Sequence, residues 1–430
     1  MKSIIPRSAD SGVRAVCRAA AGGAAALLAL AGCAATAGNA RLDSVEASGD
    51  GTLRVGLILD NTGGQGFLND SERAAAKLAV QEINATGGHK GKPVELLPDS
   101  AGDDAETQAR KLVAAKADVV VGPTDSSHAP GAIDVLSRSR VPLISPANSA
   151  AALTKYKNGG YYFRTAAADV AQASVLVKLA KDGGAKSLAV LYQDGGYGKD
   201  VSAAVAAAAR NAGLAAVSTA AFKPGDARPA AAAAQKAAPD VVVLIARDGA
   251  QGAIAELNNA GLSGSRIILS DGAFGQYGSG LGSKALEGAR AVVPGVFPTA
   301  EFQARLIAVD SGLKDLSFAA ETYDAVNLAV LAAAKADDDS GRTIAANLIA
   351  VSGGSPGGAV TEQPGKPCTS FKDCQSILKS GSGIDYDGES GPIAFDANGD
   401  ITTANFMVFT YGPDNIAHVT GREASSRAAG

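Results

Sequence analysis

The stretch DVVVGPTDSSHAP, residues 118–130, sets an apolar run directly before a polar turn and the start of a helix. The run Val119–Val121 is typical of a strand that is buried on both faces of a parallel sheet. Ser126 and Ser127 follow in the turn, and His128 fits the first turn of the next helix. A strand, a short polar turn and a helix in this order predict one βα unit of an α/β fold.

The same unit repeats along most of the chain. In the first half we predict strands at 53–60, 93–98, 118–122 and 141–145, with helices at 70–88, 104–116 and 128–139. After residues 161–169 the order restarts, with strands at 187–194, 214–222, 240–246 and 266–271 and helices at 200–212, 228–237 and 250–260. Right-handed crossovers would place these helices on both faces of each sheet.

The pattern in the last third of the chain predicts that the chain returns to the lobe formed by its first half. Residues 289–298 read as a connecting strand, and helices are predicted at 300–311, 318–335 and 342–351. A segment rich in Gly, Pro and Ser follows at 353–390, and residues 391–411 predict a β-hairpin with Asn398–Gly399 at its turn. The simplest arrangement is two α/β lobes that are joined by several strands.

The N-terminus indicates export. Basic residues precede an apolar run of 13 residues, Ala19–Ala31, which is shorter than the ~20 that span a bilayer. Leu30–Cys33 reads LAGC and resembles a lipobox, so we expect a signal peptide at 1–32 and a lipid on Cys33. The alternative is an ordinary signal peptide with an incidental cysteine. Small polar residues at 34–50 predict a flexible tether.

The composition argues against several classes of function. The formal net charge is −4, Trp is absent, and basic residues are scattered, so neither a basic face nor a stacking platform for nucleic acid is predicted. Cys368 and Cys374 are close together in an exported chain, which predicts a local disulfide. The sequence predicts no metal site and no cofactor.

The turn at 118–130 contains the residue types of a serine hydrolase, but not its geometry. Asp125, Ser126, Ser127 and His128 are consecutive, and neighbours on one turn diverge, whereas a triad lines up through successive hydrogen bonds. The string GGSPG at 353–357 has Pro356 where an oxyanion-hole N–H is needed. We therefore predict no enzyme and expect Asp125 and His128 to be bystanders.

Polar turns at the strand ends predict a ligand site instead. In open parallel sheets ligands bind beyond the carboxyl ends of the strands. Two turns of the first lobe offer serine hydroxyls and backbone N–H groups that suit a carboxylate, and turns of the second lobe offer Tyr197, Arg247 and Asp271. Ordinary helix caps would explain any one of these turns, but less well all of them together.

The chain from Arg54 to about Phe409 resembles the bacterial extracellular solute-binding proteins of branched-chain amino-acid ABC transporters, of the leucine/isoleucine/valine-binding type. The segments that carry the resemblance are AAAKLAVQEINATGGHKGKPVEL, VVVGPTDSSHA, VPLISPANSAAALT, YYFRTAAADVAQA, VLYQDGGYG and GPIAFDANGD. The resemblance implies a type I periplasmic binding protein fold, in which two doubly wound parallel-sheet lobes are joined by a three-strand hinge. It places the crossovers near 167–170, 293–297 and 392–395, with the first lobe at 51–168 and 297–392 and the second at 169–296 and 393–422.

The resemblance also implies roles for single residues. Ser126 matches the serine that binds the ligand α-carboxylate, and Ser149 matches a residue that contacts both the carboxylate and the ammonium. Asp271 lies at the position of the acidic partner of the ammonium. The remaining expected ligand contacts are Thr124, Ala147 through its carbonyl, Asn148, Tyr197, Arg247 and Leu68.

Departures from the family pattern bear on the ligand. Leu68 stands where a pocket aromatic is expected, with Phe67 beside it, and Ala246 replaces a second aromatic. These changes favour a polar or acidic amino acid, or a carboxylate without an amine, as much as leucine. We expect a monomeric, lipid-anchored extracytoplasmic protein that serves an ABC permease and its ATPase. The alternative is a ligand-sensing receptor domain on the same fold.

Overall fold

The computed structural model describes residues 39–61, 66–355 and 365–426, and the described residues from Ala40 onward belong to one compact unit. The predicted signal peptide and Cys33 lie outside the described residues. Among the residues described, no helix is both long and apolar enough to cross a bilayer.

The first sheet is parallel and has the strand order β2-β1-β3-β4-β5. Its strands are β1 (Arg54–Leu57), β2 (Glu95–Leu96), β3 (Val119–Val121), β4 (Leu143–Ser145) and β5 (Tyr162–Arg164). Every residue of β3, β4 and β5 is buried, as the apolar runs predict for strands that are covered on both faces.

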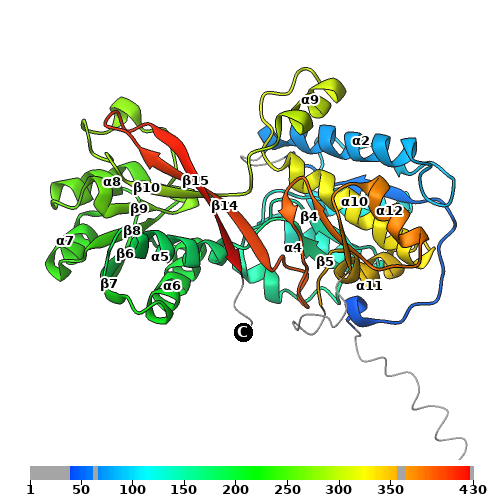
Figure 1. The fold of residues 1–430 in the computed structure, drawn as a ribbon, viewed down its shortest axis with the longest axis horizontal. Coiled ribbons are helices and arrows are strands. Elements are labelled where there is room, and N and C mark those ends of the chain that lie inside the picture. Colours follow the sequence, from blue (N-terminus) through cyan, green and yellow to red (C-terminus); the bar gives the residue numbers. More distant parts are fainter. Residues whose placement is uncertain (1–38, 62–65, 356–364, 427–430) are drawn as a thin grey trace, which may run out of the picture. The chain divides into compact units, whose positions relative to one another are not determined.

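Helices cover both faces of this sheet. They are α2 (Asn69–Ala85), α3 (Ala105–Ala114), α4 (Ala129–Arg138), α9 (Ala300–Val309), α10 (Ala319–Ala336), α11 (Gly341–Val351) and α12 (Phe371–Lys379). Helix α10 is buried along nearly its whole length, because α2, α11 and α12 all pack against it (Figure 1). The helices of the last third of the chain thus complete the core of the first sheet.

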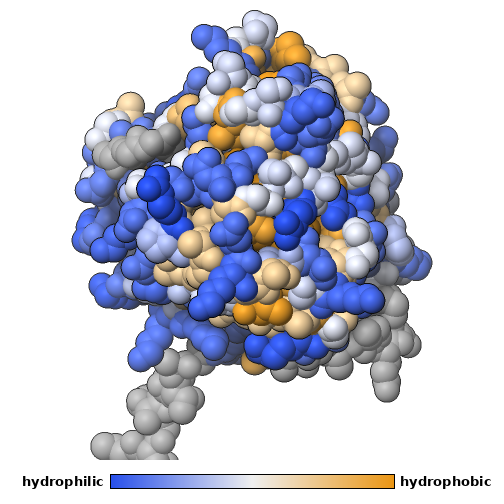
Figure 2. All heavy atoms as spheres, turned by 90° about the vertical axis from the view of Figure 1, so that its left-hand side faces the viewer, coloured by the Kyte–Doolittle hydropathy of each residue, from blue (hydrophilic) through white to orange (hydrophobic). Residues whose placement is uncertain are grey.

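The second sheet has the order β15-β14-β10-β9-β8-β6-β7. Its strands are β6 (Ser187–Gln193), β7 (Ala215–Phe222), β8 (Val241–Ile245), β9 (Ile267–Leu269), β10 (Arg290–Pro294), β14 (Thr403–Tyr411) and β15 (Ala417–Ser426). Strands β6 to β10 are parallel, whereas β14 is antiparallel to both β10 and β15. The helices that cover this sheet are α5 (Gln172–Asp182), α6 (Gly196–Asn211), α7 (Arg228–Ala237) and α8 (Ala250–Asn259). Figure 2 shows the molecule from the side of this sheet, where polar residues cover most of the face and apolar residues form small, separate spots.

The chain crosses between the sheets three times, and the first two crossovers meet the beginning of α10. After β5, the hydroxyl of Thr165 donates to the backbone oxygen of Glu321 at 2.9 Å. After β10, a Cβ placed on Gly295 would lie 3.3 Å from Glu321 Oε1. The third crossover follows Asp400, which forms a bridge to Arg164 of β5, and leads directly into β14. The start of α10 therefore contacts two of the three connections.

The segment before β1 differs from the predicted tether. Residues Ala40–Leu42 form a short 3-10 helix, and Ala40 N donates to the backbone oxygen of Gly159 at 2.8 Å. Arg41 is only 6% exposed and lies over the Phe163 ring, with 4.8 Å between its guanidinium carbon and the ring centre. Gly49 N donates to Asp338 at 2.8 Å. The expectation of a flexible tether is wrong from Ala40 onward, because this segment buries side chains and satisfies backbone groups on the folded unit.

The predicted C-terminal hairpin is only partly correct. A tight turn does occur at Asn398–Gly399, where Gly399 N donates to the oxygen of Asp396 at 3.0 Å, but only the pair Phe395 and Ile401 bridges across it. The long antiparallel pair is β14 with β15, which was not predicted, and its turn is at 412–416. The alternation of apolar and polar residues in 403–411 thus indicated a strand correctly, but the predicted partner of this strand was wrong.

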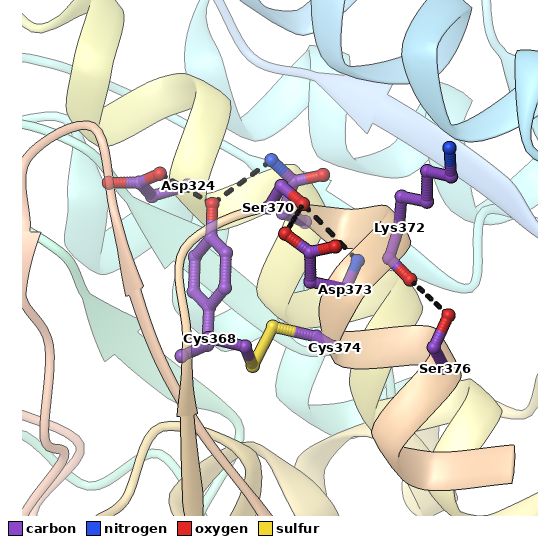
Figure 3. Close-up of a disulfide and its surroundings, with 9 residues drawn as sticks. Asp324, Cys368, Ser370, Lys372, Asp373, Cys374 and Ser376 are labelled. Carbon is purple, nitrogen blue, oxygen red and sulfur yellow. Dashed lines mark hydrogen bonds between the residues drawn. A yellow bond between two sulfur atoms is a disulfide. The ribbon is translucent and has the colours of Figure 1, made fainter.

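The segment at 353–390 is folded where the structure describes it. Strands β11 (Lys366–Cys368), β12 (Ile384–Gly388) and β13 (Gly391–Pro392) form a small sheet of their own, and α12 packs beside it. The predicted disulfide is confirmed: Cys368 and Cys374 are bonded, with Cα atoms 5.3 Å apart (Figure 3). Tyr386 of β12 donates to Asp324 of α10 at 2.7 Å, which fixes this small sheet to the main core.

Reduction of this disulfide should destabilise the protein modestly. The bond closes a loop with a sequence separation of 6. A loop this short restricts the unfolded chain little, so we expect a loss of about 2 kcal/mol in the free energy of unfolding. Denaturant unfolding with and without a reductant measures the loss. The double variant Cys368→Ser/Cys374→Ser should be insensitive to the reductant, and an equal response from it would contradict the assignment.

Candidate functional site

A cavity of about 580 Å³ lies at the carboxyl ends of the strands of both sheets. The turns that follow β3, β4, β6, β8 and β9 contribute to its walls. All the predicted ligand contacts except Asn148 line it, namely Leu68, Thr124, Ser126, Ala147, Ser149, Tyr197, Arg247 and Asp271. Leu68 is 3% exposed whereas Phe67 is 62% exposed, so Leu68 is the residue that faces inward.

Two backbone N–H groups of the first wall point at one oxygen atom. Ser126 Oγ accepts from Ser149 N at 3.2 Å and from Ala150 N at 3.3 Å. These N–H groups precede the 3-10 helix Ala151–Lys155, whose start carries a partial positive charge. A ligand carboxylate oxygen can take the place of the serine oxygen between the two N–H groups. The Ser126 hydroxyl would then donate to that carboxylate.

The backbone beneath this wall is held by close packing. Gly122 has a φ of +107°, and a Cβ there would lie 2.1 Å from the oxygen of Ile58, so only glycine fits. A cis peptide bond joins Gly122 to Pro123. Ser145 Oγ donates to the oxygen of Pro123 at 2.8 Å, which ties the end of β4 to the turn after β3.

Asn148 has a different position from the predicted one. It is fully buried and lies outside the cavity wall, and its Nδ2 donates to the oxygens of Pro123 at 3.0 Å and Thr124 at 2.9 Å. Its Oδ1 accepts from the hydroxyl of Tyr162 at 3.1 Å. Asn148 therefore positions the turn that carries Ser126, and it does not itself present a group to a ligand.

His128 and Asp125 were predicted to be bystanders, but both make hydrogen bonds within the site. His128 Nδ1 lies 2.6 Å from Oδ1 of the buried Asp60, whose Oδ2 accepts from Thr124 N at 2.9 Å and Asp125 N at 2.8 Å. Asp125 lines the cavity, and its Oδ1 accepts from the hydroxyl of Ser127 at 2.7 Å. The serines and the histidine thus have separate partners, and among the described residues of this turn no hydrogen bond joins a serine to His128. The hydrolase reading of this turn has no geometric support.

The second wall is organised around Asp271. The hydroxyl of Tyr197 and Nε2 of Gln172 both donate to Asp271 Oδ1, the latter at 2.7 Å. Gln172 Oε1 in turn accepts from Asp271 N at 3.1 Å. Burial, together with the Asp271 carboxylate, raises the pKa of Tyr197, so its hydroxyl stays protonated and keeps donating. These bonds hold the Asp271 side chain in the wall that lines the cavity.

Arg247 does not offer the free cation that the sequence predicted. Its Nη2 lies 3.2 Å from a carboxylate oxygen of Asp169, and its guanidinium carbon lies 4.4 Å from the centre of the Tyr197 ring. Burial raises the pKa of Asp169 to about 6, and the Asp271 carboxylate adds to this effect while Arg247 opposes it. Arg247 thus neutralises a buried acid of the same wall.

A smaller chamber of about 100 Å³ continues the cavity inward. It shares Ala147, Ser149, Asp271 and Phe318 with the main cavity, and its other walls come from the crossovers and from Glu321. Phe318 precedes α10 with a φ of +59°, a conformation that costs a bulky residue on the order of 1 kcal/mol. The sequence did not single out Gln172, Asp169, Phe318 or Glu321. Only the segment YYFRTAAADVAQA, which carries the first two, gave any signal.

The comparisons with known proteins agree with this geometry. The model of the family described as periplasmic binding protein matches residues 52–366. The chain belongs to this family. The match includes both walls of the main cavity, and the type I periplasmic binding protein fold predicted from the sequence is confirmed.

Two relatives and one solved structure illustrate the range of similarity. Leu/Ile/Val-binding protein BraC3 of Rhizobium johnstonii is 34% identical over 40% of this chain and 48% of its own length. The chemotactic signal transduction system substrate-binding protein BasB of Halobacterium salinarum is 26% identical over 78% of this chain and 81% of its own. The ABC transporter substrate-binding protein from Desulfitobacterium hafniense, solved with leucine, is 19% identical with a TM-score of 0.63, and the alignment covers 86% of this chain and all of that one. The chain spans about half the length of the curated Leu/Ile/Val-binding relatives that it matches.

Substitution of Asn148 should destabilise the fold first. Asn148→Ala removes the amide partner of the Thr124 oxygen and of the Tyr162 hydroxyl in a buried place, while the Pro123 oxygen keeps Ser145 as a donor, so we expect a loss of about 2–4 kcal/mol in the free energy of unfolding. Denaturant unfolding measures this loss. The control is Asn211→Ala, which removes an exposed amide and should change the stability little. Unchanged stability of Asn148→Ala together with lost ligand binding would instead make Asn148 a ligand contact.

Proposed function

We propose that this protein captures an amino acid or a related small carboxylate outside the cytoplasm and delivers it to an ABC permease. The observation that carries the proposal is the pair of opposite charges that the cavity can accept. One wall presents two convergent N–H groups and the Ser126 hydroxyl, and the other presents the Asp271 carboxylate. An α-amino acid carries a carboxylate and an ammonium on one carbon atom.

The binding geometry follows from the two walls. The ligand carboxylate accepts from Ser149 N, Ala150 N and the Ser126 hydroxyl, which costs the protein only the hydrogen bonds that Ser126 makes there. The ammonium donates to Asp271, whose position is fixed by Tyr197 and Gln172. Both contacts are charge-assisted hydrogen bonds, which are the stronger kind. Because the two walls belong to different sheets, one ligand would join them and favour a closed hinge.

Delivery requires that the protein stay near its permease. We propose that a signal peptide at 1–32 directs export and that Cys33 carries the lipid. A multiply acylated cysteine suits this role, since one acyl chain alone holds a protein only marginally.

A second function is favoured by one observation. One relative, BasB, aligns over most of both chains, and it is a substrate-binding protein of a chemotactic signal transduction system. The same cavity could therefore present its ligand to a signalling receptor instead of a permease. Deletion of the neighbouring transport genes separates the two functions, because it would abolish uptake and leave any response to the ligand intact.

Substitutions on each wall should weaken binding of the α-amino acid ligand. Ser126→Ala removes a donor to the carboxylate and should cost about 1–2 kcal/mol. Asp271→Asn removes the charge that faces the ammonium and should cost about 2 kcal/mol or more. Calorimetric titration measures both losses, after a thermal-shift screen of amino acids, amides and aromatic acids has identified the ligand.

The chain supplies a matched control for each substitution. Ser127→Ala removes the neighbouring hydroxyl, which donates to Asp125, and Asp248→Asn neutralises an exposed acid after β8. Both controls should bind as the unmodified protein does. If Ser126→Ala and Asp271→Asn also bind as tightly as the unmodified protein, the two residues do not contact the ligand.

Loss of Cys33 should release the protein from the membrane. In cells, Cys33→Ala should move the protein from the membrane fraction to the soluble extracytoplasmic fraction or the medium. Cys17→Ala is the control, since Cys17 would leave with the signal peptide. A Cys33→Ala protein that still sediments with membranes would exclude the lipid anchor.

A further inference from the structure

The inner chamber contains two carboxyl groups and no basic side chain. Its walls include Asp271 and Glu321, and the other described lining residues are uncharged. Asp271 belongs to the ammonium site proposed above. Glu321 has no role in that site, although the chamber that it lines shares four wall residues with the main cavity.

Glu321 is half-buried and differs from the buried acids near the cavity. Asp169 is paired with Arg247, and Asp324, one turn further along α10, accepts hydrogen bonds from Tyr386, Glu389 and Ser390. In the described residues, the Glu321 carboxyl has no ion pair, and the only hydrogen bond that it receives comes from its own backbone N–H. Burial raises the pKa of Glu321 to about 7, with the Asp324 carboxylate adding to the effect. The protein thus provides no counter-charge for this group.

The position of Glu321 is well defined. Its backbone oxygen accepts from Thr165 of the first crossover at 2.9 Å, and the second crossover passes so close that a Cβ on Gly295 would lie 3.3 Å from Oε1. Phe318, one turn earlier, lines both the chamber and the main cavity. A ligand held at Ser149 and Asp271 therefore sits where its side chain can enter the chamber, because both residues also line it.

We propose that the ligand is a basic α-amino acid, whose side-chain ammonium or guanidinium group binds Glu321 in the inner chamber. This inference rests on the proposed function, since it places the α-carboxylate and α-ammonium as described above. A second cation on the ligand supplies the counter-charge that the protein lacks, for a half-buried carboxylate that is costly to leave unpaired. A branched-chain side chain would leave Glu321 buried against apolar atoms, so Glu321 discriminates against such ligands.

The test compares L-lysine, L-arginine and L-leucine by calorimetric titration of the full-length mature protein. We expect lysine or arginine to bind about tenfold or more tightly than leucine. The variant Glu321→Gln should weaken binding of the basic amino acid by about tenfold or more and leave the affinity for leucine unchanged or increased. The control Glu301→Gln makes the same chemical change at an exposed position on α9 and should alter neither affinity.

The outcomes separate this inference from the proposed function. Tighter binding of leucine than of either basic amino acid would overturn the inference and leave the proposed function intact, and so would an equal loss for leucine and lysine in Glu321→Gln. If no α-amino acid binds to the unmodified protein, both fail. Thermal unfolding of the ligand-free variant shows whether it is folded, and we expect Glu321→Gln to be at least as stable as the unmodified protein, because a half-buried unpaired carboxyl is removed.

Discussion

Parallel pairing of the strands is the constraint on which the site depends. Because β1, β3 and β4 run in one direction, the turns that follow them meet at one edge of the first sheet, and β6, β8 and β9 do the same in the second. Ser126 and Asp271 are far apart in the sequence, yet each follows a short buried strand. The cavity is therefore a consequence of strand direction, and the polar residues in the turns give it its chemistry.

The sequence predicted these turns well because the signal is local. An apolar run such as VVV at 119–121 has few alternatives, and a polar turn after it indicates where the strand ends. The same reasoning missed β15 and the packing of Arg41, since both depend on partners that are distant in the sequence. Alternating residues predict that a strand exists, but they do not identify the strand with which it pairs.

Side-chain partners were harder to predict than positions. Arg247 and Asp271 were both assigned to the ligand from their place after a strand, and only the structure shows that Arg247 already pairs with Asp169. Asn148 was assigned in the same way, although its amide is fully used in holding the turn. Whether a polar group is free depends on the residues that surround it in space, and the sequence does not contain that information in local form.

The contact of two crossovers with the first turn of α10 has a mechanical consequence. When one sheet rotates against the other, the atoms nearest to the common contact point move least, and displacement grows in proportion to distance from it. Glu321 and Thr165 lie at that contact point, whereas the turns that line the outer cavity lie further from it. A ligand group at the contact point can then be recognised in nearly the same geometry throughout closure, and the groups at the mouth of the cavity would sense how far closure has gone.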